Sequence, residues 1–205
     1  MRVRRAKLRA MQIDATVPPH VPVAERGPDR DFTPSLATIE AAPKAVGRLE
    51  GIVLRPTRET RRTVDETELD LERGVVGDNW LERGSSSSPD GSARLDSQVT
   101  LISTRVLAAI EPDPSRWPLA GDQLMVDFDL SLENLPIGAR IAIGEAVLEA
   151  SPAPHTGCAK FSARFGSDAL RWINSPLGRD LRMRGMNAMV VQGGTVRVGD
   201  EVRKA

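Results

Sequence analysis

LENLPIGARIAIGEAVLEAS, residues 132–151, is the stretch that decides the fold class. Two short apolar runs, ARIAIG and EAVLEA, meet at Gly144–Glu145, and a glycine between two such runs is typical of a β-hairpin. Ile141 and Ile143 alternate with Ala142, which is the period of a strand with one buried face. The stretch therefore predicts two short antiparallel strands.

Further strand patterns lie on both sides of this hairpin. They are RLEGIVLRP after Gly47, the alternating positions of Thr63–Leu71, QVTLIS at Gln98–Ser103 and the alternating residues of Leu124–Phe128. Each run is short and ends near a proline, a glycine or a polar turn. The pattern indicates a chain of many short strands.

The C-terminal segment predicts a second hairpin, with Asn187–Gln192 paired antiparallel to Thr195–Glu201 across Gly193–Gly194. Short helices are expected after Ser103 and after Ser167, where the apolar spacing changes. Parallel β-α-β units need more helix between their strands. We therefore predict a mainly β fold, a mostly antiparallel barrel with a few short helices packed on it.

The composition indicates one domain with an N-terminal extension. Residues 1–46 are basic and then proline-rich, residues 47–202 are expected to form the domain, and residues 203–205 a tail. The basic run at Arg2–Arg9 has three interpretations: an arm for nucleic acid or membrane, a targeting peptide, or a poorly ordered leader. We favour the leader because prolines and no apolar period follow.

Several functional classes are disfavoured. Lysine plus arginine equals aspartate plus glutamate at 28 each, and aromatic residues make up only 3% with no tyrosine, so we expect no nucleic-acid partner. A single cysteine excludes an intramolecular disulfide and a multi-cysteine zinc site. No apolar run reaches membrane-spanning length and no signal-peptide core is present, so we expect no membrane partner and a cytoplasmic protein.

SPAPHTGCAKFSARFG, residues 151–166, is the candidate reactive segment. It contains the one cysteine, Cys158, and one of two histidines, His155, on a loop shaped by prolines and a glycine. Nearby cations favour the reactive thiolate form of a cysteine. Cys158 is therefore a candidate nucleophile or sulfur carrier with His155 beside it, and a buried, inert cysteine is the competing interpretation.

The segment that follows Cys158 is rich in cations. Lys160, Arg164, Arg182 and Arg184 could together bind a phosphate group, or they could form a solvated basic face. Asn134 could donate into the same pocket or hold its own loop before Pro136. His155 could act on the thiol or only order the loop.

Several of these motifs, in order, resemble the MOSC domain, which is named for the carboxy-terminal region of molybdenum-cofactor sulfurases. They include GVVGD before Trp80, ENLPIG with IGEAVLE, PHTGCAKF around Cys158, and RGMNAMVVQGGTVRVGDEV. The resemblance spans about Gly47 to Val202. It implies a barrel-like fold in a stand-alone form, because no preceding pyridoxal-phosphate domain or lysine can be identified.

The resemblance also implies a function. Cys158 occupies the position of the cysteine that the family uses to carry sulfur or to meet the molybdenum cofactor, as a possible molybdenum ligand. It implies a role in cofactor sulfuration or in reduction of N-hydroxylated compounds, with a cysteine desulfurase or a molybdoenzyme as partner. A non-catalytic barrel module that binds a ligand or protein is the alternative.

Overall fold

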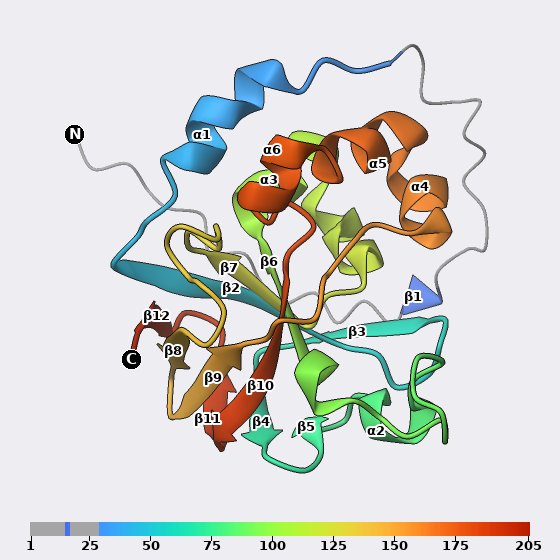
Figure 1. The fold of residues 1–205 in the computed structure, drawn as a ribbon, viewed down its shortest axis with the longest axis vertical. Helices are drawn as coiled ribbons and strands as arrows, with labels where there is room; N and C mark the ends of the chain where they lie inside the picture. Colours follow the sequence, from blue (N-terminus) through green and yellow to red (C-terminus); the bar gives the residue numbers. More distant parts are fainter. Residues whose placement is uncertain (1–14, 17–28) are drawn as a thin grey trace.

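A closed β-barrel forms the centre of the structure, a computed structural model that describes residues 15–16 and 29–205 (Figure 1). The basic run at Arg2–Arg9 and His20 lie outside the described residues. Seven described strands close the barrel in the order β2, β12, β8, β9, β10, β6, β7 and back to β2. These are β2 (Val46–Leu54), β6 (Val99–Ser103), β7 (Leu124–Asp127), β8 (Arg140–Ile143), β9 (Ala146–Ala150), β10 (Met186–Gln192) and β12 (Glu201–Lys204).

The pairing of these barrel strands is antiparallel, with β6 and β7 as the parallel exception among them. This confirms the predicted mainly β, mostly antiparallel fold. A crossover joins the two parallel strands and contains α3 (Thr104–Ile110) and the 3-10 turn Pro114–Ala120. A parallel pair needs such a long connection, whereas the antiparallel pairs can use short turns.

Smaller strands extend the barrel at one end. β3 (Thr60–Val64) pairs with the end of β2, and β1 (Ala15–Thr16) pairs with β3. A separate sheet of β11 (Gly194–Arg197), β4 (Glu66–Asp70) and β5 (Gly74–Val75) lies at the lower end in Figure 1, beside α2 (Trp80–Arg83). The pattern read as one strand over Thr63–Leu71 is thus two strands that separate at Asp65.

One predicted hairpin is confirmed and the other is wrong. β8 and β9 pair across Gly144–Glu145 with Ile143 opposite Ala146. β10 and β11, however, do not pair across Gly193–Gly194: β10 pairs with β6 and β9, and β11 with β4. The chain instead leaves the barrel at these glycines and passes close to Glu145. A Cβ on Gly194 would lie only 2.7 Å from the Glu145 side chain, so this path requires a glycine.

The burial pattern explains why these runs form strands. In β9, alternate residues Ala146, Leu148 and Ala150 are buried in the barrel, as the period predicts. Every residue of β6 is buried, since Leu101 faces the barrel core and Ile102 faces a second core under the helices. A mostly apolar run such as VTLI is typical of a strand covered on both faces, and its one polar side chain, Thr100, donates to Gln123 at 2.7 Å.

The α-helices other than α2 cover one end of the barrel (Figure 1). They are α1 (Leu36–Glu40), α3, α4 (Ala159–Phe165), α5 (Ser167–Ile173) and α6 (Pro176–Asp180). Their apolar faces form the second core with residues of the barrel wall such as Val53 and Met125. This layer positions the loop that carries Cys158, because α4 begins directly after it.

Residues before Gly47 contribute to this layer where the structure describes them. Phe32 is buried and stacks on Trp172 with ring centroids 4.7 Å apart. Arg30 donates through Nε to Asp168 at 2.8 Å and through Nη1 to the Ile110 carbonyl at 2.7 Å. Arg30 and Phe32 of the predicted extension 1–46 therefore pack on the helices, while Ala15–Thr16 pair with β3. At the other end, β12 includes Arg203 and Lys204 of the predicted tail.

Replacing Phe32 tests whether this segment belongs to the cooperative unit. We expect Phe32→Ala to lower the free energy of unfolding by about 3 kcal/mol, because it empties a buried aromatic site. Urea unfolding measures the change. Leu95→Ala is the control, since Leu95 is 57% exposed and should change stability by less than about 0.5 kcal/mol. An equally small effect at Phe32 would show that the segment unfolds independently.

Candidate functional site

The turn Leu119–Asp122, which leads into β7, is surrounded by arginines. Gly121 allows the turn because its φ of 89° is in the left-handed region that favours glycine. Three consecutive backbone carbonyls of the turn each accept a hydrogen bond from a different arginine. The pairs are Leu119 with Arg164 (2.7 Å), Ala120 with Arg184 (3.0 Å) and Gly121 with Arg55 (2.9 Å).

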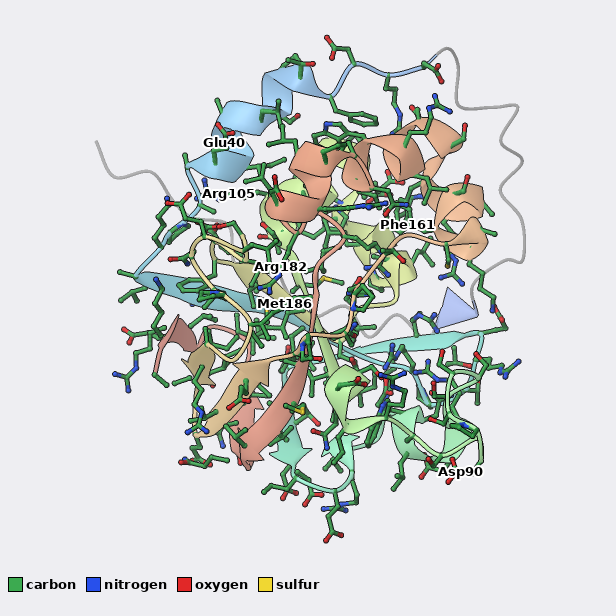
Figure 2. The ribbon with its side chains drawn as sticks, viewed as in Figure 1. Glu40, Asp90, Arg105, Phe161, Arg182 and Met186 are labelled. Atoms are coloured by element: carbon green, nitrogen blue, oxygen red, sulfur yellow. The ribbon has the colours of Figure 1, made fainter. Side chains whose placement is uncertain are left out.

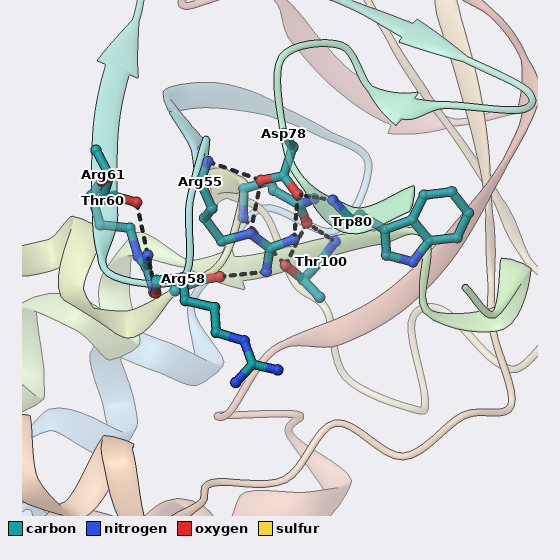
Figure 3. Close-up of polar contacts among 9 residues, drawn as sticks. Arg55, Arg58, Thr60, Arg61, Asp78, Trp80 and Thr100 are labelled. Atoms are coloured by element: carbon teal, nitrogen blue, oxygen red, sulfur yellow. Dashed lines mark hydrogen bonds and ion pairs between the residues drawn. The ribbon is translucent and has the colours of Figure 1, made fainter. Parts of the chain in front are cut away.

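Two buried carboxylates neutralise part of this charge. Arg184 donates through Nη1 to Asp122 Oδ2 at 2.6 Å, and Arg55 grips Asp78 through Nε at 2.8 Å and Nη2 at 2.9 Å (Figure 3). Both aspartate side chains are fully buried. Arg61 is also buried in this region, and no ion pair joins it to any described carboxylate. Glu59 lies 3.9 Å from Arg164, so the four arginines Arg55, Arg61, Arg164 and Arg184 face three carboxylates among the described residues.

The loop 151–158 runs along this cluster and is held in place by two amide side chains. Asn187 donates to the carbonyls of Ala153 (3.2 Å) and Pro154 (3.3 Å), and Asn174 accepts from the Gly157 amide at 3.0 Å. A Cβ on Gly157 would lie 2.5 Å from Leu170 Cδ1, so a larger residue here would force the Leu170 side chain to move. The loop is thus fixed in shape before it reaches the cysteine.

Cys158 lies at the end of this loop, directly before α4, and is exposed. Its position confirms the sequence prediction of an ordered loop, although the helix that follows was not predicted. Arg164, on α4, is near enough for a thiolate at Cys158 to oppose the lowering of the Arg164 pKa that burial causes. Lys160 is exposed and pairs with Glu59 at 3.1 Å. Glu59 also lies 3.9 Å from Arg164, so the exposed thiol is near cations whose charge is partly neutralised.

His155 lies at the inner side of the loop. Its Nδ1 is 3.5 Å from Asp122 Oδ1, and neither atom has a hydrogen-bond partner among the described residues. Burial lowers the pKa of His155 well below its usual value, and the charges of Arg184 and Arg55 lower it further. Burial also raises the pKa of Asp122 against the opposing effect of Arg184. The imidazole is therefore neutral at neutral pH.

A cavity of about 330 Å³ opens between this loop and the chain that descends from α6 into β10. His155, Arg182, Arg184 and Asn187 line it, and none of its lining residues is an aspartate or a glutamate. Figure 2 shows Arg182 and Met186 in the zone between helices and barrel. Arg182 has a positive φ of 47° and donates to the Leu135 carbonyl at 2.6 Å. Such a cavity suits an anionic ligand with an apolar body.

A family model for the MOSC domain matches residues 88–203, which is more than half of the chain. The chain belongs to the MOSC domain family. The match includes the loop 151–158, Cys158 and the cavity, whereas Arg55, Arg61 and Asp78 precede it. The family resemblance inferred from the sequence motifs is thereby confirmed.

Solved structures agree with this MOSC fold. The YuaD protein from Bacillus subtilis has 20% identity and a TM-score of 0.59, with 77% of this chain and 94% of that chain covered. A crystal structure described as a hypothetical protein has 20% identity and a TM-score of 0.55, covering 78% and 69%. At this identity the likeness shows the fold. No curated protein sequence matches the chain. Among the described residues, no helix is long and apolar enough to cross a membrane.

The structure divides the predicted site residues into two groups. Arg182, Arg184 and His155 line the cavity, while Lys160 and Arg164 lie on α4 beside Cys158, which does not itself line that cavity. Asn134 is buried in the preceding loop, where its side chain donates to the Asp129 carbonyl at 2.8 Å. Its proposed role toward a cofactor stays a prediction.

Sequence reasoning missed Arg55, Arg61 and Asp122. The run RPTRETRR at residues 55–62 carries four arginines, and this density was the available signal. Asp122 had no comparable signal, because AGDQLM reads as an ordinary turn before a strand.

The state of His155 predicts a pH dependence. A histidine in the unfolded chain titrates near pH 6.5, and the folded His155 titrates well below that. Between these two values the unfolded state binds the extra proton. The stability present above about pH 6.5 is therefore lost as pH falls toward the folded pKa, by up to about 1.4 kcal/mol per pH unit.

Urea unfolding between pH 5.5 and 7.5 measures this slope. We expect His155→Gln to flatten it. If the slope persists in His155→Gln, His155 is not its source.

Proposed function

We propose that this MOSC domain protein binds the molybdenum cofactor in the cationic cavity and uses Cys158 as a metal ligand or sulfur carrier. The observation that carries the proposal is the exposed thiol of Cys158 beside a cluster of arginines whose charge the described carboxylates do not balance. The exposure of Cys158 also removes the interpretation as a buried core cysteine.

The residues present fit an anionic cofactor of this kind. Arg184 Nε, a buried nitrogen atom of a residue that lines the cavity, has no hydrogen-bond partner among the described residues, whereas His155 Nδ1 faces Asp122 Oδ1 at 3.5 Å. A nitrogen atom without a partner is costly to bury unless a ligand completes its hydrogen bond. The phosphate of the cofactor matches the charge of Arg182, while Arg184, whose charge is paired with Asp122, can add a hydrogen bond from its unpartnered Nε.

The side chains available as metal ligands also fit the molybdenum cofactor. The described residues contain no group of three or more histidine, cysteine, aspartate or glutamate side chains that could hold a metal ion. A metal at this site must therefore bring most of its own ligands, as molybdenum does in its dithiolene cofactor. Cys158 would add one thiolate, a soft ligand suited to such a metal.

When bound, the cofactor would supply two-electron redox chemistry, the type required to reduce N-hydroxylated compounds. The protein's own residues would do the remaining work. Arg182 and Arg184 would hold the anion, the rigid loop 151–158 would fix its orientation, and neutral His155 could accept or donate one proton beside it. A cysteine desulfurase as sulfur donor, or a molybdoenzyme as acceptor, would meet the exposed face of Cys158.

Cofactor content tests the proposal directly. The wild-type protein, purified from a host replete in molybdenum cofactor, should contain molybdenum and the pterin, measured by mass spectrometry and by fluorescence of the oxidised pterin. Arg182→Gln should lower the pterin content at least fivefold, because it removes a cavity cation. Arg203→Gln is the matched control, since Arg203 is an exposed arginine on β12 outside the cavity.

Cys158→Ser separates the role of the thiol from that of the cavity. We expect at least a tenfold loss of bound molybdenum, with a change in unfolding free energy below about 1 kcal/mol, because the site is exposed. In the cofactor-free wild type, an alkylating reagent should modify one thiol rapidly without denaturant. A wild-type protein that lacks both molybdenum and pterin after expression in the replete host would refute cofactor binding.

A further inference from the structure

Arg61 is a buried arginine whose hydrogen bonds and charge are incompletely satisfied. It lies on β3 and is 7% exposed. Its Nη1 donates to two nearby backbone carbonyls, those of Thr60 at 2.8 Å and Arg58 at 3.3 Å (Figure 3). Its Nε is buried without a partner among the described residues. A buried guanidinium in this state is strongly disfavoured unless a further group completes it.

The unused edge of Arg61 is the edge that binds carboxylates elsewhere in this protein. Arg55 and Arg30 each grip an aspartate through Nε and Nη2, as a two-pronged fork. In Arg61 the same two nitrogens donate to no described residue, while Nη1 on the other side is occupied. The fork is therefore available in the geometry that matches two oxygens of one anion.

The surroundings of Arg61 favour an anion over another protein group. Its Nη2 lies beside Gly121, 3.6 Å from where a Cβ on that residue would be. Burial lowers the pKa of Arg61 to about 10, and the charges of Arg164 and Arg55 lower it further against the smaller opposing effects of Glu59 and Asp78. Asp78 neutralises Arg55, and Asp122 neutralises Arg184. The charge of Arg61, the third buried arginine near the turn, is not neutralised by a buried carboxylate.

We propose that Arg61 forms an oxyanion-binding site that takes a phosphate or sulfate group through its free Nε and Nη2. A tetrahedral oxyanion offers two oxygens to the fork and a charge that the neighbouring Arg55 and Arg164 also favour. The site is separate from the 330 Å³ cavity, whose lining does not include Arg61. It does not depend on cofactor chemistry at Cys158.

Isothermal titration of the full chain with inorganic phosphate, in a chloride buffer of low ionic strength, tests the site. Arg61→Met should weaken phosphate binding at least tenfold, because it removes both the charge and the fork. Arg62→Met is the matched control: it removes an exposed arginine from the next position of the same strand and should change binding less than twofold. Arg61→Lys keeps the charge without the fork and should lose most of the affinity.

Stability in phosphate-free buffer gives a second readout. Arg61→Met should be at least as stable as wild type there, since it removes a buried charge without a carboxylate partner, and phosphate should raise the melting temperature of wild type only. If Arg61→Met fails to fold, Arg61→Lys decides the question by titration. The proposal is overturned if wild type binds no phosphate at 10 mM, or if Arg62→Met weakens binding as much as Arg61→Met.

The source of the oxyanion is identified by the pterin content of Arg61→Met from the cofactor-replete host. Loss of both pterin and inorganic phosphate binding would place the cofactor's own phosphate at Arg61 instead of at Arg182 and Arg184, and loss of phosphate binding alone assigns the site to a separate small molecule. Both results support the oxyanion site. Phosphate binding by wild type that never contains pterin would also support it, while refuting the proposed cofactor function.

Discussion

The buried ion pair between Asp122 and Arg184, 2.6 Å apart, joins the turn before β7 to the segment before β10. It holds these two segments together where the barrel meets the helices. Gly185 follows with a φ of 96°, and a Cβ there would lie 2.2 Å from the Leu101 carbonyl oxygen of β6. Both the backbone conformation and the close approach therefore require glycine. A buried ion pair adds little net stability, but removing one partner leaves the other charge buried without a counter-charge, which is strongly destabilising. Arg184 and the loop beside it are therefore fixed in position.

The fold could be predicted where structure is local. The β8–β9 hairpin follows from alternating residues and one glycine turn, which neighbouring positions decide. The Gly193–Gly194 hairpin failed because β11 pairs with β4, where Thr195 lies opposite Glu68. Turn chemistry permits a reversal but does not choose the partner of a strand. That choice depends on closure of the barrel, which brings together residues far apart in the sequence.

The residues of the candidate site could also be predicted only where their signal is local in the sequence. Cys158 and His155 stand out because they are rare residues on one short loop. Arg61 and Arg62 are identical neighbours in sequence, yet one is buried and the other exposed, because successive strand residues face opposite sides. Asp122 meets His155 only after the barrel closes. Composition identified a cationic segment, but only the fold reveals which cations are buried and which of them lack a carboxylate.

This distinction connects stability to function. An exposed arginine is hydrated and needs no partner. A buried arginine loses its hydration, and this cost in free energy is offset only when an anion or a set of hydrogen bonds replaces the water. The family model begins at residue 88, so Arg55, Arg61 and Asp78 lie outside it and reach the matched region only through the fold. A ligand that binds the folded chain stabilises it in proportion to the logarithm of its concentration. An oxyanion beside Arg61 would therefore strengthen the contact between β3 and the turn at Gly121, the same turn on which Arg164 and Arg184 converge beside Cys158.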